Sequence, residues 1–167
     1  PDTARVKLDT KDSQVVVSAG KSRFTLQTLP AADFPRVETG AGLGESISLP
    51  QKTLKRLLQL VQFAMASQDI RYYLNGMLLV LAGNQLRVVA TDGHRLSYAE
   101  TTLESEAEAR EVIIPRKTVV ELSKLLSDVD DPVELRIGAN QVTITLPETE
   151  LVTKVVDGKF PDYQRVI

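Results

Sequence analysis

The chain has 167 residues, of which 43% are hydrophobic and 25% charged, a composition typical of a folded domain with its own core. It contains no cysteine and only one histidine, which excludes disulfides and the ligand sets of most zinc and non-haem iron sites, so we expect no metal and no other cofactor. The formal net charge of -2 excludes a generally basic nucleic-acid-binding chain, and nothing in the sequence suggests a secretory leader or a membrane span.

The first 45 residues are rich in strand patterns. The segment DSQVVVSAGKSRFTLQTLPAADFP (residues 12–35) is typical of a strand, a turn and a second strand, followed by Phe-Pro. The glycine-rich segment ETGAGLGES (residues 38–46) favours a linker, because it lacks the strand-to-helix context of a nucleotide-binding glycine loop. The chain starts at Pro1 without an initiator methionine, which fits either processing or a fragment.

An amphipathic helix is predicted after Pro50, because the missing N–H of proline does little harm at a helix start. Its apolar face has helical spacing and consists of Leu54, Leu57, Leu58, Val61 and Met65. The opposite face is weakly basic and carries Lys52, Lys55, Gln59 and Gln62. Such a face is usually only solvated, but it can also attract phosphate.

The segment SQDIRYYLNG (residues 67–76) places Arg71 beside Tyr72 and Tyr73, just before an Asn-Gly turn signal. Arginine with adjacent aromatic residues suits phosphate contact and base stacking. A strand with one tyrosine packed inward and one outward explains the same residues. From spacing alone we favour the strand.

The segment ATDGHRLS (residues 90–97) holds the only histidine, His94, close to Asp92. A hydrolase could use His94 as a base with Asp92 or Asp162 as its orienting acid. No G-x-S-x-G nucleophile motif and no nucleotide-binding glycine motif accompanies them, so we expect no catalytic residue. Thr-Asp-Gly is also good turn chemistry, since Asp can bond its own backbone and Gly accepts positive φ.

A second amphipathic helix is predicted after Pro115. Its apolar face is predicted to bury Val119, Leu122, Leu125, Leu126 and Val129. Its polar face exposes Arg116, Lys117 and Lys124. The acidic run DVDD (residues 128–131), directly before Pro132, indicates a loop after the helix.

The chain contains an internal repeat. Residues 46–61 resemble residues 111–126, since each reads as a short strand, a proline and an amphipathic helix, and residues 12–35 resemble residues 139–161, both ending in Phe-Pro. We therefore predict an α+β fold whose unit is one strand, one helix and a few antiparallel strands. Residues 46–163 hold two units, whereas residues 1–45 hold only the tail of one. A chance match between short strand motifs is the alternative.

Four segments together resemble the bacterial DNA sliding clamp family, the beta subunit of DNA polymerase III: RYYLNGMLLV, ATDGHRL, VIIPRKTVVEL and VVDGKFPDYQRV. The resemblance covers the whole chain. It implies the clamp fold, in which pseudo-twofold pairs of strand-helix-strands units place antiparallel sheets outside and two helices on the DNA-facing side. Residues 1–45 then correspond to the end of a first clamp domain with its linker, 46–163 to a complete second domain, and 164–167 to the start of the link to a third domain.

The resemblance implies a DNA polymerase processivity factor and not an enzyme. Such a clamp segment belongs to a ring that encircles duplex DNA without sequence preference, in the cytoplasm at the nucleoid. The implied partners are replicative and translesion polymerases, the clamp loader, and a second copy in a head-to-tail homodimer. Two alternatives stay open: a small hydrolase using Asp92 and His94, and a peptide-binding module without a DNA role.

The resemblance also implies three sets of site residues. Contacts to DNA are expected from Lys52, Lys55, Gln68, Arg71, Tyr72, Tyr73, Arg116, Lys117 and Lys124. A hydrophobic cleft for short peptides of polymerases and the clamp loader is expected from Leu74, Thr91, Gly93, His94, Arg95, Leu96, Pro161, Arg165 and Val166, and it should be half built without a third domain. The contact to a neighbouring subunit is expected from an edge strand with Lys21, Arg23, Phe24 and Leu26.

Overall fold

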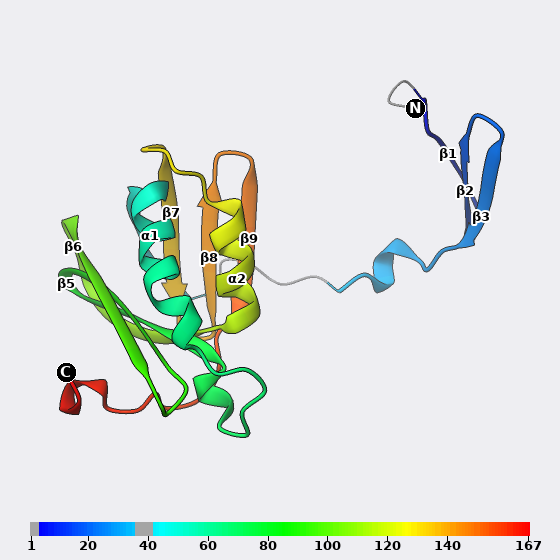
Figure 1. Cartoon of the computed structure of the whole chain (residues 1–167). Helices are drawn as coiled ribbons and strands as arrows, with labels where there is room; N and C mark the ends of the chain where they lie inside the picture. The colour runs from blue at the N-terminus through cyan, green and yellow to red at the C-terminus, as the bar shows by residue number, and fades with distance from the viewer. Residues whose placement is uncertain (1–3, 36–41) are drawn as a thin grey trace. The chain divides into compact units, whose positions relative to one another are not determined.

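The structure, a computed structural model, describes residues 4–35 and 42–167, which fall into two compact units, Pro1–Glu38 and Thr39–Ile167 (Figure 1). Residues 38–41 of the predicted linker lie outside the described residues. The remaining linker positions from Leu43 onward already belong to the first strand of the second unit. That strand therefore begins three residues before the predicted start of the second domain at residue 46.

The first unit is one small antiparallel sheet followed by a single 3-10 turn at Ala31–Asp33. Its strands are β1 (Lys7–Lys11), β2 (Gln14–Ala19) and β3 (Ser22–Gln27), paired in that order. The register places Leu8, Val17 and Phe24 in one row across the three strands. Leu8 and Phe24 are both exposed, so this apolar row has little cover.

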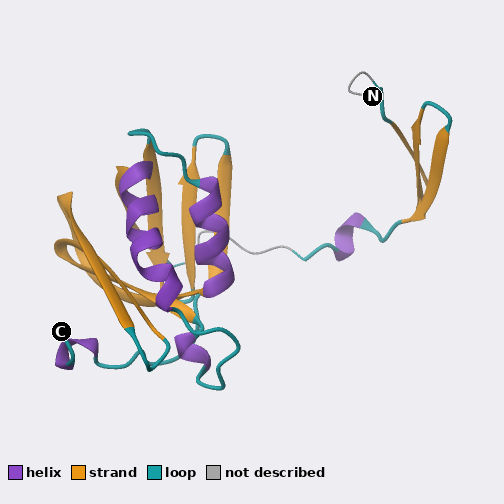
Figure 2. Ribbon diagram, viewed as in Figure 1, coloured by secondary structure: helices purple, strands orange, loops and turns teal. Residues whose placement is uncertain are grey.

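The second unit has two helices, two antiparallel sheets and short 3-10 turns. Its elements are β4 (Leu43–Pro50), α1 (Gln51–Val61), β5 (Gly76–Thr91), β6 (Leu96–Pro115), α2 (Arg116–Leu125), β7 (Pro132–Gly138), β8 (Gln141–Leu146) and β9 (Thr149–Lys154). One sheet has the order β4-β7-β8-β9, and the other consists of β5 and β6. The two helices lie side by side against the sheets and run in opposite directions (Figures 1 and 2). The predicted α+β class with antiparallel sheets is confirmed.

The first repeat unit differs in detail from the prediction. Two long strands, β5 and β6, follow α1 in place of three short ones, and the end of β6 also serves as the strand that leads into α2. The β5–β6 register shifts on both sides of Gly83, whose φ is 58°. A glycine suits this irregularity because residues with a Cβ rarely adopt positive φ.

The pseudo-twofold repeat is visible in matched hydrogen bonds at the two helix starts. Each helix begins directly after a proline, Pro50 or Pro115, with an extended backbone. The first N–H of α1 donates to the carbonyl of Asp131 over 3.0 Å, and the first N–H of α2 donates to the carbonyl of Asn75, also over 3.0 Å. Each loop therefore caps the helix of the other unit, which satisfies an N–H that a helix leaves unpaired.

The main core lies between the helices and the two sheets. It contains the whole predicted apolar face of α1, together with alternate residues of β4, β5, β7 and β8. The prediction for α2 was partly wrong, since Val119, Leu122 and Leu126 are buried whereas Leu125 and Val129 are exposed. The helix ends at Leu125 and Leu126 is already extended, so the helical period no longer applies beyond that point.

A second, smaller cluster covers the opposite face of the β5–β6 sheet. It is formed by Leu78, Val89 and Ile113 from the strands and by Phe160 and Tyr163 from the segment that follows β9. These two aromatic residues are 4% and 8% exposed, so they anchor the end of the chain on the sheet. The anchoring brings residues 160–166 to the turn between β5 and β6.

Candidate peptide pocket and nucleic-acid interface

The turn between β5 and β6, residues 91–96, is held by its own polar side chains. The Thr91 hydroxyl donates to the Arg95 carbonyl over 2.7 Å and accepts from the Gly93 N–H over 3.1 Å. Asp92 Oδ1 accepts from the N–H groups of His94 and Arg95, over 2.9 and 3.0 Å, and its Oδ2 accepts from Arg95 Nε over 3.1 Å. The backbone bonds from His94 and Arg95, with the Arg95 charge, lower the pKa of Asp92.

Because of these bonds, neither nearby carboxylate is free to orient His94 as a catalytic base. Both oxygens of Asp92 are occupied within the turn, and Asp162 pairs with Arg165 Nε over 2.8 Å. Among the residues that the structure describes, no hydrogen bond reaches the exposed His94 imidazole. The Asp-His arrangement is therefore explained as turn chemistry, with neither carboxylate orienting a base.

The loop before β5, residues 67–75, is fastened in a similar way. Asp69 N–H donates to Asn75 Oδ1 over 3.0 Å, and Asn75 Nδ2 donates back to the Asp69 carbonyl over 2.8 Å. The Asp69 carboxylate receives three bonds from Arg71: from its N–H at 2.8 Å, from Nε at 3.0 Å and from Nη2 at 2.8 Å. The side-chain bond from Arg71 is the largest influence that lowers the pKa of Asp69 to about 2.

The loop and the turn form two walls of one hollow of about 330 Å³, and residues 161–166 form a third. Eight of the nine predicted cleft residues line it, namely Leu74, Thr91, Gly93, His94, Arg95, Leu96, Pro161 and Val166. Arg165 does not line it and points into its ion pair with Asp162. The hollow thus gathers residues that lie far apart in the sequence around an apolar floor.

Four lining residues were missed as cleft residues: Arg71, Tyr73, Asp162 and Tyr163. Arg71 and Tyr73 were predicted instead to contact DNA. The FPDY segment carried a usable signal for Tyr163, because an aromatic residue close to a predicted cleft residue tends to pack under it. Tyr163 belongs to the buried cluster against which the cleft residue Leu96 packs.

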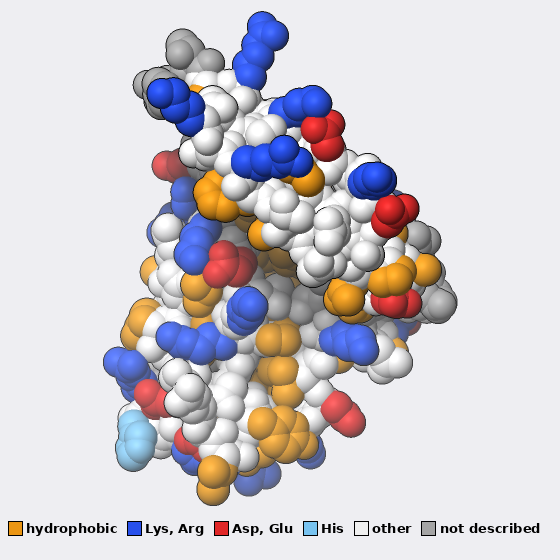
Figure 3. All heavy atoms as spheres, turned by 90° about the vertical axis from the view of Figure 1, so that its right-hand side faces the viewer, with side chains coloured by type: hydrophobic (Ala, Val, Ile, Leu, Met, Phe, Trp, Pro, Cys, Tyr) orange, Lys and Arg blue, Asp and Glu red, His pale blue; other side chains and the backbone are white. Residues whose placement is uncertain are grey.

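The helix residues that were predicted to contact DNA differ in whether their side chains already have a partner. Lys52 pairs with Asp130 over 2.6 Å, Lys124 pairs with Glu121 over 3.0 Å, and Arg116 Nη1 donates to the Met65 carbonyl over 3.1 Å. Within residues 4–35 and 42–167, Lys55 and Lys117 form neither ion pairs nor hydrogen bonds through their side chains. Figure 3 shows one face of the molecule, on which Asp and Glu side chains are interspersed among the Lys and Arg side chains.

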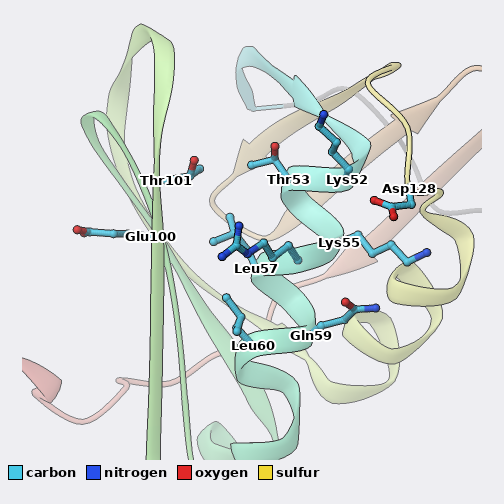
Figure 4. Close-up of a pocket in the computed structure, with 10 residues that line it drawn as sticks. Lys52, Thr53, Lys55, Leu57, Gln59, Leu60, Glu100, Thr101 and Asp128 are labelled. Carbon is cyan, nitrogen blue, oxygen red and sulfur yellow. The ribbon is translucent and has the colours of Figure 1, made fainter.

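A hollow of about 780 Å³ lies between α1 and β6. Figure 4 shows Lys52, Thr53 and Lys55 on the helix, with Glu100 and Thr101 on the facing strand. Arg56 also lines this hollow, is exposed, and was not among the predicted contacts.

The other predicted DNA-contacting residues lie in the loop 67–75. Gln68 and Tyr72 are exposed, and Gln68 has a φ of 58°, which is unusual for a residue other than glycine. Tyr72 packs edge-on against Tyr73, with ring centroids 5.9 Å apart. The loop therefore presents one surface to solvent and another to the pocket.

The predicted subunit-contact strand is β3, which is an edge of the small sheet. Phe24 is 60% and Leu26 is 51% exposed, and both belong to the same face of the strand. Lys21 lies in the turn before the strand, and Arg23 is exposed on its other face. This edge offers unpaired backbone groups together with apolar side chains.

Two kinds of feature are absent from the described residues. No group of three or more His, Cys, Asp or Glu side chains could hold a metal ion. No helix is long and apolar enough to cross a membrane.

The chain is similar in sequence to proteins of one known family. Residues 48–162 match the family model for the DNA polymerase III beta subunit, central domain. The whole chain is 44% identical over 167 residues to the beta sliding clamp of Escherichia coli (strain K12), and 47% identical over 168 residues to that of Pseudomonas putida KT2440. It covers 45% and 46% of those proteins, so it spans about half the length of the curated relatives it matches.

Solved structures agree with the sequence comparison. The fold is similar to a crystal structure of the DNA polymerase III subunit beta from Pseudomonas aeruginosa, with a TM-score of 0.90 and 45% identity over all of this chain and 46% of that one. It is also similar to the DNA polymerase sliding clamp of Caulobacter crescentus, with a TM-score of 0.85 and 41% identity over all of this chain and 46% of that one.

Proposed function

The chain belongs to the DNA polymerase III beta subunit family, the bacterial sliding clamps, and from that membership we propose that it acts as part of a DNA polymerase processivity factor. In this role it is a segment of a ring that encircles duplex DNA and carries polymerases along it. The observation that carries the proposal is the similarity of the entire chain, in sequence and in fold, to such clamps. The protein at the length of these relatives is called the full-length protein below.

The proposal assigns DNA contact to the polar faces of the two helices and to the loop 67–75. Lys55, Arg56 and Lys117 support it best, because their charges are not taken up by ion pairs among the described residues. Gln68 and Tyr72 add exposed polar and aromatic groups on the loop. A few weak phosphate contacts give a sequence-independent attraction that weakens with salt, which suits a protein that must slide.

The proposal assigns peptide docking to the three-walled pocket of about 330 Å³. Leu74, Leu96, Pro161 and Val166 supply apolar area for leucine or phenylalanine anchors. The peptides belong to replicative and translesion polymerases and to the clamp loader. The edge strand β3, with Phe24 and Leu26, is assigned to a second copy in a head-to-tail homodimer.

The proposal does not include catalysis. The bonds of Asp92 to the backbone of its own turn support this, because a hydrolase would need that carboxylate to orient His94. Replacing His94 with Ala in the full-length protein should abolish no turnover in a screen of ester and phosphate substrates. Any activity that depends on His94 would contradict the assignment.

Two experiments test the proposal. The full-length protein, loaded onto DNA by a clamp loader, should stay on circular duplex DNA and leave linear duplex DNA; equal retention on both would rule out encirclement. A Gln-x-x-Leu-Phe-type peptide should bind the full-length protein, and Leu96→Asp should abolish that binding by placing a charge on the apolar floor. Binding of the peptide without retention on circular DNA would favour a peptide-binding module with no DNA role.

A further inference from the structure

Arg71 stands where the loop 67–75 meets the turn 91–96. Its Nη2 donates to the Asp92 carbonyl over 3.2 Å, and this is the one hydrogen bond between loop and turn among the described residues. A Cβ placed on Gly93 would lie 2.9 Å from Arg71 Nη1 and 3.1 Å from Nη2, so the guanidinium lies directly against the Gly93 backbone. Two of the three pocket walls are therefore joined through a single side chain.

The guanidinium is aimed by Asp69. Nε and Nη2 donate to the two carboxylate oxygens of Asp69 over 3.0 and 2.8 Å, which is the bidentate geometry that fixes the plane of the group. The second N–H of Nη2 donates to the Asp92 carbonyl. Within the described residues Nη1 has no hydrogen-bond partner, so its two N–H groups remain for an acceptor on a ligand.

The surroundings of the pair favour orientation over stability as its role. The Arg71 side chain is 45% exposed, and exposed ion pairs add little to the stability of a fold. The side-chain bond from Arg71 lowers the pKa of Asp69 to about 2, so both members of the pair are charged at neutral pH. Because the Arg71 side chain is already held in one orientation beside the apolar floor, less side-chain entropy is lost when a peptide binds.

We propose that Asp69 is a positioning residue of the peptide pocket, which pins Arg71 against Gly93 so that Nη1 donates to a carbonyl or carboxylate oxygen of the docked peptide. This inference rests on the proposed docking function of the same pocket. It assigns Arg71 to the peptide and leaves DNA contact on this loop to Gln68 and Tyr72.

The test uses the full-length protein and the Gln-x-x-Leu-Phe-type peptide, with affinity measured by fluorescence polarisation. Asp69→Asn keeps the shape of the side chain but loses the charge, and it should weaken peptide binding about three- to tenfold through the lost preorganisation of Arg71. Arg71→Lys keeps the charge but loses the fork and should weaken binding by a similar factor. The melting temperature should change little, because exposed ion pairs add little to the stability of a fold.

Glu108→Gln provides a matched control. Glu108 pairs with Arg110 over 2.7 Å at the same two-residue spacing as Asp69 and Arg71, but on β6 and outside the pocket lining. Its loss should leave peptide affinity unchanged. A double variant, Asp69→Asn with Arg71→Lys, should bind no more weakly than either single variant, because both changes remove one aimed guanidinium.

The outcomes separate the inference from the function on which it rests. No binding of the peptide by the unmodified protein would overturn the docking function, and the inference with it. Normal binding by Asp69→Asn or by Arg71→Lys would overturn the inference alone. Additive losses in the double variant, or an equal loss in Glu108→Gln, would also overturn it, since Asp69 would then act by some route other than Arg71.

Discussion

Replacing Gly93 with Ala tests the close approach of Arg71 to the turn. Gly93 has a φ of 86°, and a side chain in this region of backbone space is strained by about 1–2 kcal/mol. The new Cβ would also lie 2.9 Å from Arg71 Nη1, so the guanidinium must move away from its bond to the Asp92 carbonyl. That lost bond adds about 0.5–1.5 kcal/mol.

The two contributions can be separated with a second glycine. Gly83 also has a positive φ, 58°, but a Cβ there would meet nothing within 4 Å. Gly83→Ala in the full-length protein should therefore lose only the backbone strain, seen as a lower thermal unfolding midpoint with normal peptide affinity. Gly93→Ala should lose about 0.5–1.5 kcal/mol more stability than Gly83→Ala, through the lost bond to the Asp92 carbonyl. Its peptide affinity should fall about tenfold, since about 1.4 kcal/mol corresponds to a factor of ten.

Peptide titration shows whether the contact between Arg71 and Gly93 shapes the pocket. If Gly93→Ala bound peptide as well as Gly83→Ala does, the contact between Arg71 and Gly93 would have no part in shaping the pocket. Gly93→Asn gives an independent check, because asparagine tolerates positive φ but still carries a Cβ. It should regain stability relative to Gly93→Ala without regaining peptide affinity.

Three further predictions concern the core, the outer cluster and the helix faces. Leu58→Ala should destabilise the fold by about 2–5 kcal/mol because this leucine is 1% exposed, whereas Leu60→Ala on the same helix, at 46% exposed, should change stability by less than about 0.5 kcal/mol in urea unfolding. Burial, with a bond to a nearby carboxylate, raises the pKa of Tyr98 from 10.0 to about 12, so the folded state holds that proton more tightly; this stabilisation is complete below pH 10 and is lost as the pH rises to 12. Between pH 10 and 12, Tyr98→Phe should therefore lose less thermal stability than the unmodified protein, and an equal loss in both would contradict the raised pKa of Tyr98. Charge reversal of Lys55 and Lys117 together should shorten retention on circular DNA and reduce its dependence on salt, measured as residence time from 50 to 200 mM salt, with about one unit of slope for each lost phosphate contact.

Local sequence signals predicted the parts of the fold that depend on neighbouring residues. The helix starts at Pro50 and Pro115 follow from proline geometry, and the apolar face of α1 follows from its period. The helix end at Leu125 did not follow, because no glycine or proline marks it and the chain simply turns extended at Leu126. Leu125 and Val129 were consequently expected to be buried, but the buried face of the helix ends before them and both are exposed.

The pocket was predictable only in part for a different reason. Family resemblance supplied most of its lining, yet it assigned Arg71 to DNA together with Gln68, Tyr72 and Tyr73 of the same loop. What determines its direction is the pair with Asp69, two residues away, and the carbonyl of Asp92, which is distant in sequence. A bond to a backbone carbonyl leaves no signature in residue type, so no reading of one sequence could have identified it.

The three pocket walls share one design, since each is braced by an Asp-Arg pair from its own segment: Asp69 with Arg71, Asp92 with Arg95, and Asp162 with Arg165. Among the described residues, one hydrogen bond joins two of these walls, from Arg71 to the Asp92 carbonyl. These exposed pairs orient the side chains within each wall but add little stability, and one hydrogen bond resists small shifts between walls only weakly. A pocket built this way holds its donors in place while its width adapts, which suits docking of several related peptides better than the fixed geometry a catalytic site requires.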